Sequence, residues 1–303
     1  MSQYDPYINE QKYFKTTSLP KSPRSNSSIE NYAHSYNSSY SSSNYEPPCE
    51  LWFDRYLTAL HILAQTYDVK SEQNQKAMKC FIICLCDILP NSETRQMMSD
   101  FISMKPKVMK VLFDSRSITL NTFFKVNSQV ITIISASPDT FLDYCLASSD
   151  ALFMWTYLFH AYYDIISKRE PESYNNLKTK YDRQIITKPM WANPLWWIIH
   201  YSAYYAPKPI TSEWKLAYVA FMSCLQNVLP CSICRAHIKE NLPKNDIQSC
   251  FTSSDKIFEW TWKLHNTVNE SLQKPLISLE ECKKVYDPYL QNYVTQNSNM
   301  TKY

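Results

Sequence analysis

The sequence contains no glycine among its 303 residues. Gly-rich phosphate-binding loops, including the dinucleotide fingerprint and the P-loop, are therefore excluded, so a dinucleotide would have to be held in another way. Tight hairpins that need a positive φ are disfavoured as well. The absence points to an all-helical fold, although compositional drift alone would also produce it.

Excess charge of one sign and long apolar runs are also missing. The formal net charge is +3 and there is no basic block, so nucleic acid is not expected as a main partner. The longest apolar run, near 151–163, is too short to span a bilayer and contains His160. The polar start resembles neither a signal peptide nor an Arg-rich presequence. We expect a soluble protein without a membrane span.

Cysteine, in contrast, is abundant, with ten residues. Without a signal peptide, this number favours redox or metal chemistry over a secreted disulfide framework. Residues 18–43 contain 11 serines and cannot bury enough apolar surface to order themselves. We expect a disordered tail over 1–48, a helical region over 49–167, a linker over 168–189, a folded domain over 190–292 and a flexible tail over 293–303.

Capping residues and prolines predict where most of the helices begin or end. Asn91-Ser92 follows Pro90 and can cap a helix, and Ser137 before Pro138 suggests another helix start. Only residues 130–134 resemble a strand, and they are equally compatible with a buried helix. In the last third we predict an antiparallel four-helix bundle. Its helices open at Pro194, at a Ser212 cap, at Cys231 and at Asp255.

The segment Pro230-Cys231-Ser232-Ile233-Cys234-Arg235-Ala236-His237 contains a C-x-x-C pair. It can be a redox dithiol, half of a zinc site or two reduced cysteines. A helix N-terminus at Cys231 and the charge of Arg235 would both favour a thiolate. Zinc needs two more ligands, and His265 comes 28 residues after His237 rather than three to five. We therefore favour the redox interpretation, with no metal.

Three polar or aromatic side chains share a helix face with His265. These are Trp262, Asn266 and Asn269, at spacings typical of one face. Trp196 and His200 are likewise one helical turn apart, a stripe that alone would favour a core position. Beside a dithiol, the two stripes together indicate a site for a planar, polar ligand.

The order and spacing of these segments over about 190–290 resemble the Erv/ALR family of FAD-linked sulfhydryl oxidases. The resemblance is carried by Trp196-x3-His200-x4-Tyr205, Pro230-Cys231-x2-Cys234-x2-His237 and His265-Asn266-x-Val268-Asn269-x2-Leu272-x-Lys274-Pro275. It implies a helical FAD-binding bundle that needs no glycine loop. By position, it implies that FAD is contacted by Trp196, His200, Tyr205, His237, Trp262, His265, Asn266, Asn269, Lys274 and Tyr289. Cys234 would be the sulfur nearest the flavin, and Cys231 would exchange with a client dithiol.

The chain departs from the family pattern at Lys263, where many members have a cysteine. Its usual partner, Cys282, is left either free or paired with Cys250 or Cys224. Ala192 and Asn193 replace small or basic residues that often begin the first motif. Larger viral members carry an extra helical region, and residues 155–163 faintly echo 196–205. No C-x-x-C follows that echo, so a second active site is not expected.

The resemblance implies an enzyme that forms disulfides in protein dithiols, passing electrons to FAD and then to O2 to give H2O2. A homodimer in the cytoplasm or nucleus of a cell, possibly an infected one, or in a virion would fit, and the mitochondrial intermembrane space less so. The alternative is a non-enzymatic helical protein that retains a decayed oxidase bundle. Cys49 is the only cysteine near the tail, and Cys80, Cys84 and Cys86 lie in an apolar run, so we predict no N-terminal shuttle.

Overall fold

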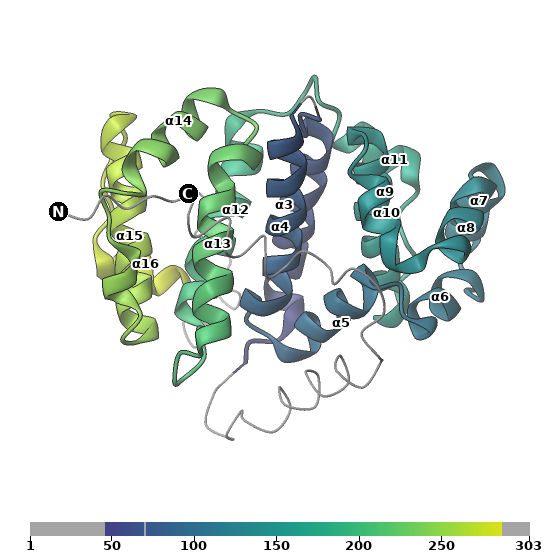
Figure 1. The fold of residues 1–303 in the computed structure, drawn as a ribbon, viewed down its shortest axis with the longest axis horizontal. Coiled ribbons are helices and arrows are strands. Elements are labelled where there is room, and N and C mark those ends of the chain that lie inside the picture. The colour runs from purple at the N-terminus through teal and green to yellow at the C-terminus, as the bar shows by residue number, and fades with distance from the viewer. Residues whose placement is uncertain (1–45, 70, 287–303) are drawn as a thin grey trace, which may run out of the picture.

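The computed structural model describes residues 46–69 and 71–286, and within these ranges every regular element is a helix (Figure 1). The all-α prediction is therefore confirmed. Tyr289, residues 1–45 of the tail predicted over 1–48 and the tail predicted over 293–303 lie outside the described residues, whereas residues 46–48 are described and Pro47 is buried. The first part of the chain forms η1 (Cys49–Leu51), α3 (Phe53–Thr66), α4 (Glu72–Ile88), α5 (Ser92–Ile102), α6 (Pro106–Phe113), α7 (Ile118–Val126), α8 (Ser128–Ala136), η2 (Pro138–Thr140), α9 (Phe141–Cys145), α10 (Ser149–Ile166) and α11 (Tyr174–Lys180).

The second part forms α12 (Lys188–Tyr204), α13 (Ser212–Val228), α14 (Ser232–Asn241), η3 (Ile247–Cys250), α15 (Ser254–Ser271) and α16 (Leu279–Tyr286). Side-chain caps fix most starts, because a Ser, Thr or Asn oxygen accepts a free N–H of the first turn. The predicted cap at Asn91 is present, at 3.0 Å from the N–H of Thr94. Residues 130–134 lie in α8, so they form a helix rather than a strand, but only Val130 and Ile134 among them are buried. The predicted linker contains α11.

Two predicted helix starts were wrong. Thr211, not Ser212, caps α13, since the Thr211 hydroxyl accepts the Trp214 N–H. The helix that was expected to open at Pro194 begins at Lys188 instead, with Pro194 inside it. A proline in the second turn removes a single backbone hydrogen bond, and the apolar side chains around it are buried on the bundle core. Burial therefore outweighs the local signal.

The fold contains the same arrangement of five helices twice. We call α3, α4, α5, α10 and α11 the first bundle, and α12, α13, α14, α15 and α16 the second bundle. Helices α4 and α13 both have 17 residues, start after a hydroxyl cap (Ser71 or Thr211) and are followed directly by Leu-Pro-x-Ser-x-x-Arg. Helices α10 and α15 both have 18 residues and are followed by a residue with positive φ, Lys168 or Gln273. The region before the second bundle is therefore a divergent copy of it.

This repeat corrects one correspondence expected from the sequence. Residues 155–163 lie in α10, which matches α15 rather than α12. The helix that matches α12 is α3, together with η1. Helices α6 to α8 have no counterpart in the second bundle and are an insertion after α5. Helix α9 corresponds to η3, because Cys145 and Cys250 each come three residues before the serine that caps α10 or α15.

The two bundles pack side by side through α4 against α13 and α3 against α12 (Figure 1). Phe81 of α4 stacks on Phe221 of α13, with ring centroids 5.1 Å apart. These residues hold the same position in the two copies, so an approximate two-fold axis passes through their contact. Buried side chains form one continuous apolar core through both bundles. The exact domain boundaries stay a prediction.

Candidate functional site

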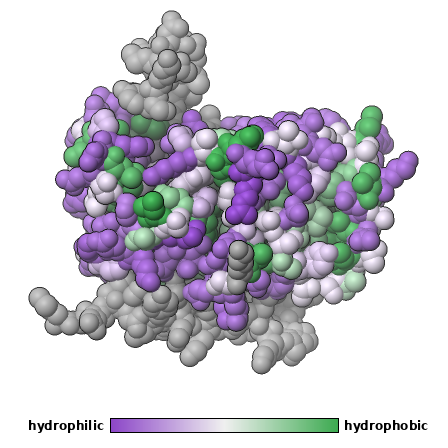
Figure 2. All heavy atoms as spheres, turned by 90° about the horizontal axis from the view of Figure 1, so that it is seen from above, coloured by the Kyte–Doolittle hydropathy of each residue, from purple (hydrophilic) through white to green (hydrophobic). Residues whose placement is uncertain are grey.

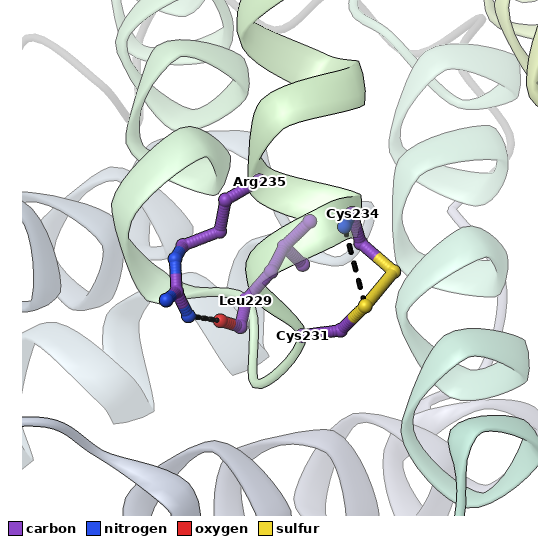
Figure 3. Close-up of a disulfide and its surroundings, with 4 residues drawn as sticks. All are labelled: Leu229, Cys231, Cys234 and Arg235. Carbon is purple, nitrogen blue, oxygen red and sulfur yellow. Dashed lines mark hydrogen bonds between the residues drawn. A yellow bond between two sulfur atoms is a disulfide. The ribbon is translucent and has the colours of Figure 1, made fainter.

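The C-x-x-C pair is a disulfide at the start of α14 (Figure 3). The Cα atoms of Cys231 and Cys234 are 5.1 Å apart, within the range that a disulfide spans. Cys231 is the N-cap residue, as predicted, and its sulfur accepts the Cys234 N–H at 3.2 Å. Both cysteines are partly exposed. A small thiol or an extended client segment can therefore approach the sulfurs.

Arg235 turns away from the sulfurs (Figure 3). Its Nη1 donates to the carbonyl oxygen of Leu229 at 2.6 Å, across the corner between α13 and α14. In the first bundle Arg95 makes the same bond to Leu89 at 2.5 Å, although Asn91 and Thr94 replace the cysteines there. We therefore assign Arg235 to holding the corner, which differs from the thiolate-stabilising role expected from the sequence.

A buried hydrogen-bonded chain joins α12 to α15. His200 Nδ1 lies 2.8 Å from the Thr261 hydroxyl, and His200 Nε2 lies 2.9 Å from His265 Nδ1. The Thr261 hydroxyl donates to the Phe258 carbonyl, so it accepts from His200 Nδ1–H. A neutral His200 then accepts from His265 Nδ1–H. The unprotonated Nε2 of His265 remains as an acceptor.

Both imidazoles are neutral near pH 7. Burial lowers the pKa of His200 well below its usual range, and the neighbouring His265 lowers it further. Burial, and then the charge of Lys274, lowers the pKa of His265 to about 4. The ring of Trp196 stacks on His265 with centroids 4.0 Å apart and planes 4° apart. Trp196, His200 and His265 thus form one aromatic set, as the sequence predicted.

Two other residues that were predicted to contact the ligand, Asn266 and Trp262, form hydrogen bonds to the backbone of Ile277. The Asn266 amide donates to the Ile277 carbonyl at 2.8 Å and accepts the Ile277 N–H at 3.2 Å. The indole N–H of Trp262 donates to the same carbonyl at 2.7 Å. We call this arrangement the Ile277 latch. It fixes segment 273–278 against α15, and sequence reasoning did not anticipate it because Ile277 carries no distinctive signal.

The remaining predicted residues lie on or next to α12, α14 and α15. Tyr205 is the C-cap of α12, and its hydroxyl donates to the Tyr286 carbonyl at 3.3 Å. The Tyr286 ring lies 5.3 Å from that of His200. The carbonyl of Asn269 accepts the Lys274 N–H, so Lys274 follows directly from the end of α15. His237 lies half-buried on α14, one turn after Cys234. Thr261 and Tyr286 are site residues that the sequence reasoning missed.

These residues fit FAD. Parallel rings at Trp196 and His265 offer a platform for a flat heterocycle. The free Nε2 of His265 can accept a hydrogen bond, and Lys274 supplies a cation for a phosphate. All of this is built from helix faces and one latched segment, and no glycine loop is required. The first bundle lacks most of it: Leu57, Ala161 and Asp164 stand where Trp196, Asn266 and Asn269 stand in the second.

The first bundle nevertheless retains the histidine chain. His61 Nδ1 lies 2.9 Å from the Thr156 hydroxyl, and His61 Nε2 lies 3.0 Å from His160 Nδ1. The surroundings of this histidine chain differ from those in the second bundle, because the Tyr181 ring stacks on His61 and Arg169 pairs with Asp164. A histidine chain kept where no dithiol exists indicates that it joins helices as well as lining a site.

Other cysteines do not form bridges in the described part of the chain. Cys282, Cys250 and Cys224 are buried thiols, so Cys282 is free rather than paired. Within residues 46–69 and 71–286, no three His, Cys, Asp or Glu side chains cluster as a metal site. No helix in these ranges is both long enough and apolar enough to cross a bilayer.

Comparison with known proteins matches residues 193–288 to the model of the Erv1 / Alr family. An FAD-linked sulfhydryl oxidase of African swine fever virus is 32% identical over 107 residues, which are 34% of this chain and 86% of the relative. FAD-linked sulfhydryl oxidase ERV1 of Arabidopsis thaliana is 32% identical over 31% of this chain and 49% of its own. A probable FAD-linked sulfhydryl oxidase of Acanthamoeba polyphaga mimivirus is 31% identical over 28% of this chain and 61% of its own. No solved structure matches the chain. The second bundle, with its disulfide and aromatic set, makes this chain a member of the Erv1/Alr family.

Proposed function

We propose that this protein is a flavin-linked thiol oxidase that joins cysteine thiols of client proteins into disulfides, using Cys231 and Cys234 as its redox centre. The observation that carries the proposal is the partly exposed disulfide at the start of α14, in the same bundle as the stacked Trp196–His265 pair. The relatives named FAD-linked sulfhydryl oxidases align with this bundle and support the same chemistry.

In the proposed reaction, oxidation of the client dithiol is balanced by reduction of the Cys231–Cys234 disulfide. A client thiolate attacks the sulfur of Cys231, the Cys231–Cys234 bond breaks, and Cys234 leaves as a thiolate. The second client thiol, after losing its proton, attacks the client sulfur of the mixed disulfide and releases Cys231. The client has then lost two electrons and two protons, and the Cys231–Cys234 pair holds the two electrons.

The proposed FAD contacts within the described residues come from α12 with its C-cap, α14, α15 and the latched segment. They are Trp196, His200, Tyr205, His237, Trp262, His265, Asn266, Asn269 and Lys274. Tyr289, which lies outside the described residues, is proposed from the family resemblance alone. The chemistry that FAD supplies when bound is acceptance of two electrons and their delivery to dioxygen, with hydrogen peroxide as the product. Cys234 is the proposed electron donor because, by position, the family resemblance implies that it is the sulfur nearest the flavin.

Neutral histidines suit such a site. His200 and His265 carry no charge near pH 7, so they orient a ligand by hydrogen bonds and stacking. The latch at Ile277 keeps segment 273–278 on α15 and closes this side of the bundle. Several of the relatives are viral, which supports a role in an infected cell or a virion. A homodimer would have to use a surface other than the α4–α13 contact, which is already covered.

The test is the purified full chain. We expect a flavin absorption spectrum, and oxidation of dithiothreitol with one O2 consumed and one H2O2 formed per disulfide. Cys231→Ser and Cys234→Ser should each abolish turnover. A colourless protein, or turnover that survives both substitutions, would favour the alternative of a structural protein with a decayed oxidase bundle.

A further inference from the structure

The corner between the second and third helices occurs twice, and in the first bundle it holds a carboxylate. Glu46 Oε2 accepts the Ser92 N–H at 2.8 Å and the Ser92 hydroxyl at 2.6 Å. Its other oxygen, Oε1, lies 3.2 Å from Nη2 of Arg95. Ser92 is the first residue of α5, so the carboxylate lies at a helix N-terminus, where free N–H groups and the helix dipole favour an anion.

The second bundle keeps the same donors. Ser232 is the first residue of α14, and Arg235 follows it at the spacing of Arg95 from Ser92. Both arginines donate Nη1 to the preceding leucine carbonyl, so each guanidinium is anchored in the same way. Within residues 46–69 and 71–286, no carboxylate pairs with Arg235, whereas Arg95 has Glu46.

The acidic residue itself has been replaced. Alignment of α3 with α12 through the histidine chain matches His61 with His200, and therefore Glu46 with Ile185. Both residues come two positions before the residue that caps their helix, Pro48 or Thr187. Ile185 is 54% exposed. The second bundle therefore has the donors of a carboxylate site without a carboxylate of its own at that position.

This site adjoins the disulfide. Ser232 directly follows Cys231, and Asn91 takes the place of Cys231 in the first bundle. Ser232 and Ile233 are exposed, so a client can reach them. On the face seen in Figure 2, the described apolar residues form separate small groups on a mainly hydrophilic surface. The described residues visible on this face therefore offer mainly polar contacts.

We propose that Ser232, Arg235 and the N-terminus of α14 form a carboxylate-binding site for an aspartate or glutamate of the client, close to the client cysteine that attacks Cys231. The client's acidic residue takes the role that Glu46 has in the first bundle. Charge-assisted hydrogen bonds from a serine, a backbone N–H and an arginine select a carboxylate over an amide. The proposal rests on the proposed oxidase function for its biological meaning, but binding itself does not depend on turnover.

The first experiment measures binding to the full-length, FAD-loaded, oxidised protein. Fluorescent peptides carry serine in place of the client cysteine and one Glu placed one, two or three residues before it, each matched by a Gln peptide. For at least one spacing, we expect the Glu peptide to bind about fivefold more tightly, with the preference shrinking as salt rises. Equal affinities for Glu and Gln at all spacings would overturn the proposal.

The decisive variant is Ser232→Pro. Proline is well tolerated at the first helical position, and the extended backbone of Cys231 suits a following proline. The change removes both the N–H and the hydroxyl and should bring the Glu-to-Gln ratio near one. The matched control is Ser92→Pro, at the same position of α5 after an equally extended Asn91, which should retain the wild-type ratio. A ratio that survives Ser232→Pro would place the acidic preference elsewhere.

The second experiment repeats the Glu and Gln comparison with cysteine-containing peptides and reads the ratio of kcat/KM. We expect the same fivefold preference in wild type and its loss in Ser232→Pro. If wild type oxidises neither dithiothreitol nor any peptide, the proposed oxidase function fails while the binding result still decides the site. If it oxidises dithiothreitol and treats Glu and Gln peptides alike, the carboxylate site fails alone.

Discussion

At the scale of single residues, the two cysteines differ by one turn of backbone. Cys231 caps α14 from outside the helix, and Cys234 belongs to its first turn. The sequence identified this pair, and it predicted one stripe with Trp196 and His200 and another with His265, because spacing within a helix determines which side chains share a face. The stacking of Trp196 on His265 joins two helices and came only from the structure. It did not reveal what Asn266 and Arg235 contact, since both bind backbone carbonyls that any residue type could supply.

The first prediction separates the two sulfurs. Cys231→Ser should leave Cys234 as a thiolate beside the flavin and produce a long-wavelength absorption band, whereas Cys234→Ser should lack this band. Both variants should lose dithiol oxidation. The measurement is an absorption spectrum of each purified variant near pH 8, with wild type as the oxidised control. A band confined to Cys234→Ser would exchange the two roles.

The second prediction concerns pH. His200, His265 and His61 have folded-state pKa values well below about 6.5, the value of an unfolded histidine, so the unfolded chain binds more protons on acidification. Their contribution to stability is complete above pH 6.5 and is lost as pH falls from 6.5 toward 4. Each proton taken up on unfolding lowers the free energy of unfolding by about 1.4 kcal/mol per pH unit.

Chemical denaturation of the wild-type protein at pH 7.0, 6.0, 5.0 and 4.5 tests this. The groups facing the second histidine chain are Thr261, Tyr286 and the cation of Lys274, which opposes protonation. We expect a slope steeper than one proton between pH 6 and 5. A flat profile over that interval would show that these histidines do not titrate on unfolding.

At the scale of elements, the Ile277 latch joins α15 to the segment that carries Lys274. The counterparts of Asn266 and Trp262 in the first bundle are Ala161 and Tyr157, so the latch occurs only beside the disulfide. The histidine chain and the arginine corner, in contrast, occur in both bundles. Elements shared by both copies maintain the fold, and the latch is therefore a candidate for ligand retention.

The third prediction follows from this difference. Asn266→Ala should speed hydrogen exchange of the Ile277 amide by at least about tenfold, because that N–H loses its acceptor, and flavin release should become faster. Thr267→Ala, a neighbouring change at a half-buried residue whose hydroxyl bonds to the Lys263 carbonyl rather than to Ile277, is the matched control. Hydrogen exchange by mass spectrometry over 273–278 and the flavin off-rate are the measurements. Unchanged exchange with faster flavin loss would instead support direct contact between Asn266 and the ligand.

Prediction of elements from sequence succeeded where a cap or an apolar stripe acted alone. Asn91 starts α5 because its side chain satisfies an N–H that no other group reaches. The prediction that a helix begins at Pro194 was wrong, because burial of Trp191 and Leu195 in the core stabilises the helix on both sides of the proline. The repeat is also visible in the sequence, since residues 145–160 and 250–265 share the pattern Cys-x-x-Ser-Ser-Asp-x-x-Phe-x-Trp-Thr-x-x-x-His, but it was missed because residues 155–163 were compared with 196–205 instead.

At the scale of the whole molecule, the bundles share one core. Removing residues before 168 would expose the faces of α12 and α13 that cover α3 and α4. A truncated chain therefore cannot test whether the N-terminal part relays electrons, since it would lose its packing partner. The question has to be asked in the full chain, through the cysteines outside the second bundle.

The fourth prediction is that no relay exists. Cys84 and Cys145 are fully buried, and burial raises the pKa values of Cys145 and Cys86 well above the ordinary thiol value. Cys49 is half-buried, close to the Tyr163 hydroxyl, and burial also raises its pKa. Full-length Cys49→Ser should oxidise a reduced protein client at the wild-type rate. Loss of client oxidation with dithiothreitol oxidation intact would identify Cys49 as a relay or docking cysteine.

The repeat shows that α6 to α8 are an insertion in only one of the two copies. In a dimer of identical chains, every insertion is present twice and alters both halves equally. Here the two bundles are different segments of one chain, so an insertion can change the surface of one bundle and leave the other bundle unaltered. The added helices lie at the end of the molecule away from α14 (Figure 1). Covalent linkage of the copies has thus allowed an asymmetric molecule in which new surface can evolve without crowding the disulfide.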